Sequence, residues 1–266
     1  MDMTVALLAN ANVVEEITSK NLWTFHVGSY PFHFSNHMLM IAVASIILMV
    51  VLPMVLRRPV LVRTGFGNAI ETICVYIRED VARPFLKDHT DRYIGILWTL
   101  FFFILTMNLL GLMPITQFVY VLTKQKNIGG APTANIWVTG ALAVFSFLLF
   151  HIAGIWEKGF WHYIKTFTPK VPWPMFPFMF ALEIVSSFVR LFSLAIRLFA
   201  NILAGHILLA VILGFIMIFK NFMVATASEL ATVMFSLLEL FVAFLQAYIF
   251  VFLTTIFIGF AIADEH

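Results

Sequence analysis

The sequence is poor in cysteine and in charged residues. Cys74 is the only cysteine among the 266 residues, so a secreted domain held together by internal disulfides is excluded. Charged residues make up 11% of the chain, whereas soluble domains usually contain about 25%. The 16 basic and 14 acidic residues cannot cover a soluble globule, and a net charge of +2 is too small for a nucleic-acid-binding protein. A soluble enzyme and a nucleic-acid-binding protein are therefore excluded.

Motifs for catalysis and cofactor binding are also missing. The sequence contains no phosphate-binding loop, no triad around a nucleophile and no cluster of metal-binding residues. We therefore expect neither a cofactor nor a metal, and any nucleotide chemistry must reside on partner proteins. Internal repeats and low-complexity segments are absent as well.

Long apolar stretches dominate what is present. Hydrophobic residues make up 62% of the chain, and the mean hydropathy is +0.98. Several stretches exceed the roughly 18 apolar residues that mark a membrane-spanning helix. The sequence predicts an all-α integral membrane protein, with an extracytoplasmic segment at 1–36 and a membrane domain at 37–266. The five expected spans are residues 38–56, 93–113, 135–156, 178–218 and 226–261.

Residues 65–91 differ from these spans. Apolar residues such as Ile70, Ile77 and Val81 recur there at helical spacing, while charged residues such as Arg78 and Glu79 occupy other faces. This pattern predicts an amphipathic helix that lies at the membrane interface or covers other helices.

The last two apolar segments are unusually long. Forty helical residues extend about 60 Å, which is about twice the hydrocarbon thickness of a bilayer. Each segment is therefore either two spans joined by a short break or one strongly tilted helix, and such a tilt requires protein on both sides.

Basic residues set the expected orientation, because loops rich in lysine and arginine stay in the cytoplasm. Such residues follow the first and third spans. They are Arg57, Arg58, Arg63, Lys158, Lys165 and Lys170. With an odd number of crossings, the N-terminus lies outside and the C-terminus lies in the cytoplasm. The first 36 residues lack a basic region followed by an apolar core, so we expect no cleaved signal peptide.

A polar stripe runs along residues 178–218. At 100° per residue its members fall within about a third of the helix circumference, and the residues between them are apolar. The members are Glu183, Ser186, Ser187, Arg190, Ser193, Arg197 and Asn201. His206 points away from Arg197, so we expect it to serve a different aqueous region.

A second stripe follows residues 226–261, and we expect it to face the first one. Its members are Thr232, Ser236, Glu239, Gln246 and Thr254.

Arg197 is the most costly of these residues to place in a membrane. An arginine at the bilayer centre costs about 3 kcal/mol on insertion scales. The next charged residue is Lys220, so the arginine side chain cannot reach water at that end of the helix. One interpretation is a structural ion pair with Glu183 or Glu239. Two aligned polar stripes favour an ion pathway instead.

Four motifs resemble those of subunit a of F-type ATP synthases. Residues 197–206 (RLFANILAGH) resemble the arginine signature of that family, and residues 245–250 (LQAYIF) are similar to the motif of its last helix. Residues 108–114 (NLLGLMP) and 132–135 (PTAN) match two further stretches. The matches follow the family order from about Gly65 to the C-terminus, while the N-terminal region is matched loosely.

The resemblance implies a stator subunit that conducts protons, or sodium in some relatives, past a rotating ring of c subunits. It is a non-catalytic, ion-translocating subunit of a complex that makes ATP. Its implied partners are the c ring, the peripheral-stalk subunit b, the rest of the ATP synthase and the lipid of a bacterial inner membrane. The resemblance also implies that the last two helices form a strongly tilted hairpin around the ring.

The resemblance assigns a role to each polar position. Arg197 is the essential charge that faces the ring carboxylate. The half-channel open to the outside contains Asn135, Asn201, His206, Glu239 and Gln246. The cytoplasmic half-channel contains Glu183, Ser186, Ser187 and Arg190. Asn135 departs from the aspartate that many bacterial members carry at this position.

Two other classes of protein fit the sequence less well. A proton- or sodium-coupled secondary transporter favours inverted repeats and helices broken by glycine or proline in two halves, and the sequence shows neither. A haem protein needs paired ligands, but His151, His162 and His206 lack a paired arrangement. The sequence leaves open the choice between proton and sodium and the number of ring subunits.

Overall fold

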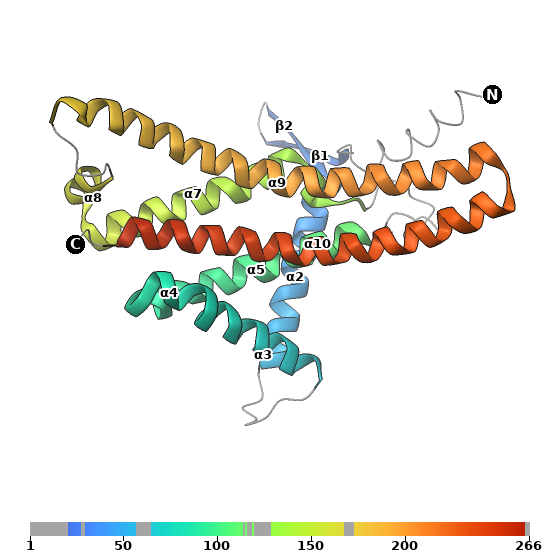
Figure 1. Ribbon diagram of the computed structural model, residues 1–266, viewed down its shortest axis with the longest axis horizontal. Helices are drawn as coiled ribbons and strands as arrows, with labels where there is room; N and C mark the ends of the chain where they lie inside the picture. Colours follow the sequence, from blue (N-terminus) through green and yellow to red (C-terminus); the bar gives the residue numbers. More distant parts are fainter. Residues whose placement is uncertain are drawn as a thin grey trace. The chain divides into compact units, whose positions relative to one another are not determined.

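A computed structural model of the chain describes residues 21–27, 30–56, 65–113, 115, 119, 129–167 and 173–263. Five helical segments are long and apolar enough to cross a membrane, which confirms the all-α integral membrane class. They are α2 (Asn36–Leu56), the segment Phe66–Leu112 that ends in α5 (Thr90–Leu112), α7 (Ile136–Lys158), α9 (Phe176–Phe219) and α10 (Phe222–Ile262). Their order along the chain can be followed in Figure 1.

Several residues that set the expected orientation lie outside the described part of the chain. These are Arg57, Arg58, Arg63, Lys170 and the side chain of Lys165, together with the first 20 residues and the last three.

The chain folds as two compact units, and each combines segments far apart in the sequence. The first unit contains residues 1–49, 103–139 and 197–246, and the second contains residues 50–102, 140–196 and 247–266. The five long helical segments therefore each contribute to both units. In α9 the division falls between Ile196 and Arg197.

The first unit contains a small antiparallel hairpin that the sequence analysis did not anticipate. It pairs β1 (Asn21–Val27) with β2 (Tyr30–Ser35), and β2 continues directly into α2. Asn36, at the start of α2, is buried and donates a hydrogen bond from Nδ2 to the carbonyl oxygen of Gly129, at 2.9 Å. This bond ties the start of α2 to the segment that precedes α7.

That segment packs closely against the long helices of the first unit. Ala131 and Ala134 form a buried cluster with Ile202 of α9. Gly111 of α5 faces Ala131 so closely that a Cβ at position 111 would lie 2.9 Å from the Ala131 Cβ. The short turn η3 (Pro132–Ala134) is thereby held beside α9 at Ile202, the residue that follows Asn201.

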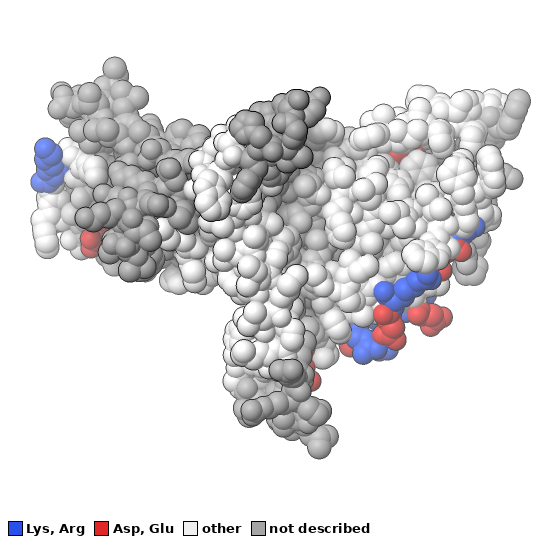
Figure 2. Space-filling model, turned by 180° about the vertical axis from the view of Figure 1, so that it is seen from behind, with Lys and Arg blue, Asp and Glu red and all other residues white. Residues whose placement is uncertain are grey.

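The second unit contains the expected amphipathic segment. It consists of α3 (Phe66–Tyr76), a π-helical stretch η1 (Ile77–Ala82), α4 (Arg83–Leu86) and η2 (Lys87–His89). Ile70, Ile77 and Val81 are buried, whereas Arg78 forms an ion pair with Asp91 at 2.6 Å and Arg83 pairs with Glu79. Charged side chains are few on the face of the molecule shown in Figure 2, as expected of a chain surrounded by lipid.

Within the second unit, α10 packs closely against both α4 and α7. Gly259 of α10 touches α4, because a Cβ there would lie 3.0 Å from the carbonyl oxygen of Phe85. Ser146 of α7 and Thr254 of α10 share a hydrogen bond of 2.7 Å. A short helix, α8 (Phe160–Thr166), follows α7 where the sequence predicted only a loop.

Helices α9 and α10 contain 44 and 41 residues and are unbroken. The alternative of two spans joined by a break is therefore wrong for both. In the first unit the two helices run antiparallel after a tight turn, as Figure 1 shows. Lys220 in this turn has a positive φ of 46°, and Asn221 caps α10 by accepting the N–H of Met223 at 3.1 Å.

Candidate functional site

The carboxyl group of Glu239 lies between α10 and α9. A Cβ built at Gly205 of α9 would overlap this carboxyl group, with the Glu239 Cδ at only 2.7 Å. The Oε1 atom of Glu239 is buried and has no hydrogen-bond partner among the described residues. The absence of a side chain at position 205 therefore leaves room for the carboxyl group in this position against α9.

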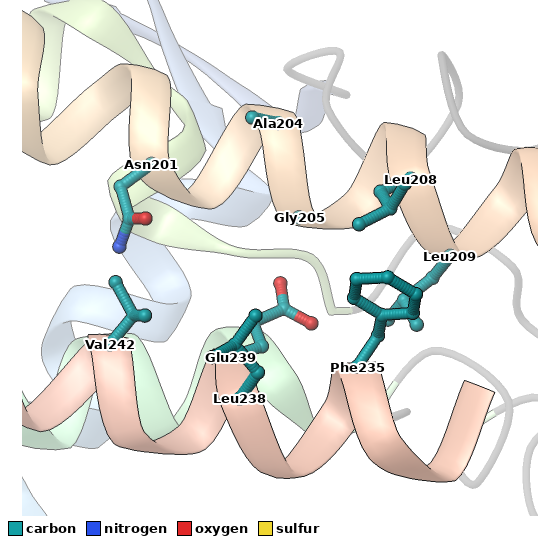
Figure 3. A pocket seen from close by; sticks show the side chains of 9 residues that line it. All are labelled: Asn201, Ala204, Gly205, Leu208, Leu209, Phe235, Leu238, Glu239 and Val242. Carbon is teal, nitrogen blue, oxygen red and sulfur yellow. The ribbon is translucent and has the colours of Figure 1, made fainter. Parts of the chain in front are cut away.

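A pocket of about 180 Å³ opens beside this carboxyl group. It lies between the first-unit parts of α9 and α10, and Figure 3 shows Asn201 directed towards α10 and Glu239 directed towards α9. The rest of the lining is apolar. It consists of Ala204, Gly205, Leu208, Leu209, Phe235, Leu238 and Val242. The volume is large enough for several water molecules beside one carboxyl and one amide group.

Two buried amide side chains lie in the same unit. Gln246 of α10 is 4% exposed, and its Nε2 makes no hydrogen bond to any described residue. Asn108 of α5 is fully buried and donates from Nδ2 to the carbonyl oxygen of Ala243, at 3.2 Å. Asn108 was expected only as part of the motif at residues 108–114, although an amide inside an apolar span was itself a signal. Buried amides with unused hydrogen-bonding capacity favour bound water.

The remaining residues expected in the outer half-channel are His206 and Asn135. His206 follows Gly205 and is half-buried. Asn135 accepts the backbone N–H of Trp137 at its Oδ1, at 2.9 Å, and so caps the start of α7. All five expected residues of the outer half-channel therefore belong to the first unit, and Asn135 has a structural task there.

Arg197 is exposed on α9 and has neither a hydrogen bond nor an ion pair with any described residue. The expected alternative of an ion pair with Glu183 or Glu239 is therefore wrong for this structure. Small exposed residues, Ser193, Ala200 and Ala204, lie within about 60° of Arg197 around the helix. Small side chains allow another helix to approach closely.

The chain leaves α9 largely uncovered. In an apolar 18-residue stretch of each helix, 11% of α9 is buried inside the chain, against 44% of α10. Arg197 and the small residues near it are themselves exposed, so this surface is available to lipid or to another protein.

The residues expected in the cytoplasmic half-channel all lie in the second unit. Arg190 donates from its guanidinium to Glu183 Oε1 at 3.0 Å, and both side chains are mostly buried. Arg190 also lies over the ring of Phe257, at 5.3 Å from its centroid. Ser187 is buried and its Oγ has no partner among the described residues, and Ser186 is half-buried. Glu183 is therefore the counter-ion of Arg190.

The second polar stripe faces the first only in part. Glu239 does face α9, but Thr254 bonds to Ser146 of α7. The two residues are about 22 Å apart along α10 at 1.5 Å per residue. A helix of this length meets different neighbours along its course, so the expectation that the whole stripe faces α9 is wrong at Thr254.

The fold and these side chains define a multi-pass integral membrane protein with ionisable groups inside apolar helices, where such groups usually mark ion pathways. The family model described as ATP synthase A chain matches residues 38–259. The chain therefore belongs to the ATP synthase A chain family, which confirms the resemblance expected from the motifs.

Individual relatives agree with this family. ATP synthase subunit a 2 of Prosthecochloris aestuarii is 36% identical over 90% of this chain and 72% of its own length. ATP synthase subunit a of an Anaeromyxobacter species is 36% identical over 97% of this chain and 62% of its own length. ATP synthase subunit a of Myxococcus xanthus is 37% identical over 90% of this chain and 76% of its own length. The chain thus spans less than two thirds of the Anaeromyxobacter protein and more of the other two.

Family membership confirms the expected role of an ion-conducting stator subunit within an ATP synthase. It also sets aside the secondary transporter.

Proposed function

We propose that this chain conducts protons through two offset half-channels and exchanges them with the carboxylates of a rotating c ring. The observation that carries the proposal is Arg197, a cation without a partner among the described residues, exposed on an apolar helix between small side chains. This is the surface that a ring helix with a mid-membrane carboxylate would cover, because the charge and the small residues complement it.

Arg197 changes the proton affinity of a ring carboxylate that comes near it. A carboxyl group facing lipid holds its proton, because burial disfavours the charged form. A positive charge about 4 Å away is worth roughly 4 kcal/mol at an effective dielectric of 20, or about three pKa units. The ring carboxyl therefore releases its proton when it reaches Arg197, and it takes up a new one after it has passed.

The outer half-channel supplies that new proton. In this proposal Glu239 is the proton-carrying group, Asn201 and Gln246 orient water beside it, and His206 and Asn135 lie along the entry route. The Glu239 oxygen without a hydrogen-bond partner among the described residues, beside a pocket that can hold several water molecules, supports this assignment.

The cytoplasmic half-channel receives the released proton. Glu183, Ser186, Ser187 and Arg190 form its polar wall. Glu183 and Arg190 form an ion pair, so their charges offset one another. The pair therefore lines a polar path but does not lower the pKa of the ring carboxyl group as Arg197 does. The division of α9 at Arg197 puts this group and the outer group in different compact units, as two separate half-channels require.

Arginine suits the position between the half-channels. Its pKa, above about 12, keeps it charged, whereas a buried lysine can lose its proton and open a leak. Each proton that falls through 100 mV supplies about 2.3 kcal/mol, and the offset of the half-channels converts this energy into rotation in one direction.

The same proposal covers topology and partners. Residues 1–36 form the extracytoplasmic segment and residues 37–266 the membrane domain, with the C-terminus in the cytoplasm of a bacterial cell and the spans in its inner membrane. The long helices α9 and α10 lie strongly tilted against the c ring, and peripheral-stalk subunit b contacts the chain elsewhere.

Cysteine cross-linking in the assembled complex tests this surface. Cys74→Ser removes the only cysteine of this chain, and Ala200→Cys then places one thiol near Arg197. The proposal predicts a disulfide to cysteines placed beside the carboxylate in the helices of a small ring proteolipid. Ile152→Cys, at an exposed position of α7, is the matched control and should give no such product. Equal or absent cross-linking from position 200 contradicts the proposal.

A further inference from the structure

His151 of α7 and Tyr163 of α8 form a hydrogen-bonded pair in the second unit, towards the end of α7 that the proposed topology places in the cytoplasm. The Nδ1 atom of His151 and the Tyr163 hydroxyl are 2.7 Å apart. Gly154, almost one helical turn after His151, lies against the Tyr163 ring, and a Cβ at position 154 would overlap that ring. The glycine therefore lets the phenol approach α7 closely enough to bond to the imidazole.

Aromatic rings surround the imidazole of His151. The ring centroids of Phe147 and Phe150 lie 4.4 and 4.3 Å from it, and that of Phe167 lies 5.9 Å away. These rings cover part of the imidazole, which is half-buried. The hydrogen bond to Tyr163 is thus a directed contact in an apolar setting.

The pair is connected through this aromatic cluster to the ion pair of the cytoplasmic half-channel. Phe257 of α10 lies under the Arg190 guanidinium, at 5.3 Å, and 5.7 Å from Phe150, the residue before His151. Phe147 also stacks on Phe188 of α9, beside Ser187. The imidazole therefore shares one cluster with the polar wall formed by Ser187 and Arg190.

Among the described residues, the charged groups that act on Tyr163 are Glu183 and Arg190 of α9. Burial, and after it the carboxylate of Glu183, raises the pKa of Tyr163 to about 12, and the Arg190 guanidinium opposes this change. Tyr163 therefore remains a neutral hydrogen-bonding group at physiological pH. From α10, Phe257 reaches the cluster.

We propose that His151 and Tyr163 form a proton relay at the exit of the cytoplasmic half-channel, an inference that rests on the proposed function. His151 accepts a proton at Nε2 while its Nδ1–H bonds to the Tyr163 oxygen. The Nδ1 proton then passes to that oxygen as the hydroxyl proton leaves to cytoplasmic water. One proton enters at Nε2 and one leaves from the hydroxyl, so the imidazole ends as the neutral Nε2–H tautomer, and proton exchange with water returns it to the Nδ1–H tautomer.

A purely structural role for the pair leads to a different prediction. If the bond only anchors α8 to α7, then any side chain that keeps the bond preserves function. Glutamine at position 151 can hydrogen-bond to the Tyr163 hydroxyl but cannot take up a proton. His151→Gln therefore separates anchoring from proton transfer.

The test is ATP-driven proton pumping by inverted membrane vesicles that contain the assembled complex, normalised to the amount of this subunit. The relay predicts that His151→Gln lowers the pumping rate by about tenfold or more, as expected when a positioned acid–base group is lost. His162→Gln, at an exposed position of α8, is the matched control and should pump normally. Wild-type pumping by His151→Gln overturns the relay.

Two further variants keep the result decisive. If His151→Gln lowers the amount of assembled subunit, Tyr163→Phe is compared with it per complex: loss of pumping in both variants supports the relay, whereas unchanged pumping in either one overturns it. Arg197→Ala is measured in the same vesicles. Normal pumping by Arg197→Ala contradicts the proposed function itself, whereas loss there with normal pumping by His151→Gln removes only the relay.

Discussion

The carboxyl group of Glu239 rests against the backbone of Gly205, with its Cδ 2.7 Å from the place where a Cβ would stand. The two residues come from different helices and lie 34 positions apart in the sequence. Their contact brings an ionisable group of α10 to the helix that carries Arg197. A side chain at position 205 would therefore move the Glu239 carboxyl group away from its present place against α9.

Gly205→Ala should displace the Glu239 carboxyl group. The carboxyl group ends a flexible side chain and borders a pocket, so we expect slower ATP-driven proton pumping in vesicles with little change in the melting temperature of the solubilised complex. Gly140→Ala is the control, because nothing lies within 4 Å of a Cβ at that helical position. Equal behaviour of the two variants contradicts the importance of the close contact.

Glu239→Gln keeps the shape of the side chain and removes its ability to bind and release a proton. We expect passive proton flux through the membrane sector to fall by about tenfold or more, measured as the decay of a pH gradient in vesicles stripped of the catalytic sector. Glu229→Gln changes an exposed carboxylate of the same helix and should leave the flux unchanged. Undiminished flux in Glu239→Gln removes this residue from the pathway.

Glu183 and Arg190 should behave as a coupled pair. Glu183→Gln leaves a mostly buried guanidinium without its counter-ion, which costs more than removing both charges. A double-mutant cycle with Arg190→Gln should give a coupling energy of roughly 0.5–3 kcal/mol from thermal melting of the solubilised complex. Additive effects of the two substitutions contradict the observed ion pair.

Tyr163 should contribute to stability at alkaline pH. Burial, and then the Glu183 carboxylate, raises its pKa from 10.0 to about 12. The folded state binds this proton more tightly than the unfolded state, so the contribution is complete below pH 10 and disappears as the pH rises from 10 to 12. Tyr163→Phe cannot titrate.

The alkaline loss of stability should be smaller in Tyr163→Phe by an amount on the order of 2 kcal/mol. Melting temperatures of the solubilised complex between pH 9 and pH 12 measure this difference. Identical pH dependence in the two proteins shows that Tyr163 does not titrate in the way the structure implies.

The long helices could be predicted from the sequence because the length of an apolar stretch and its charge content decide whether it spans a membrane. The amphipathic segment could be predicted for a similar reason, since Ile70, Ile77 and Val81 are buried as their spacing indicated. These signals are local and do not depend on which helices are neighbours.

Pairing between side chains could not be predicted in the same way. The stripe on α9 placed Glu183 near both arginines around the helix, but the structure pairs it with Arg190 and leaves Arg197 exposed. Periodicity gives the direction of a side chain and not the neighbour at that level. For the same reason Thr254 faces Ser146 of α7, and the contact between Gly205 and Glu239 was not foreseen.

The short elements were missed for another reason. The hairpin of β1 and β2 and the helix α8 are short, and isolated elements of this size are marginal without tertiary contacts. Asn36, the residue directly after β2, bonds to Gly129, and Tyr163 of α8 bonds to His151 of α7. Such long-range contacts leave little trace in the local sequence.

Coupled proton pumping by Arg197→Ala tests the central claim most directly. The measurement compares ATP hydrolysis with acidification of inverted vesicles that contain the assembled complex, and Arg78→Ala serves as a control because Arg78 pairs with Asp91 in the amphipathic segment. The account predicts that Arg197→Ala assembles but pumps no protons, while Arg78→Ala pumps normally. Proton pumping at the wild-type ratio to ATP hydrolysis in Arg197→Ala would contradict it.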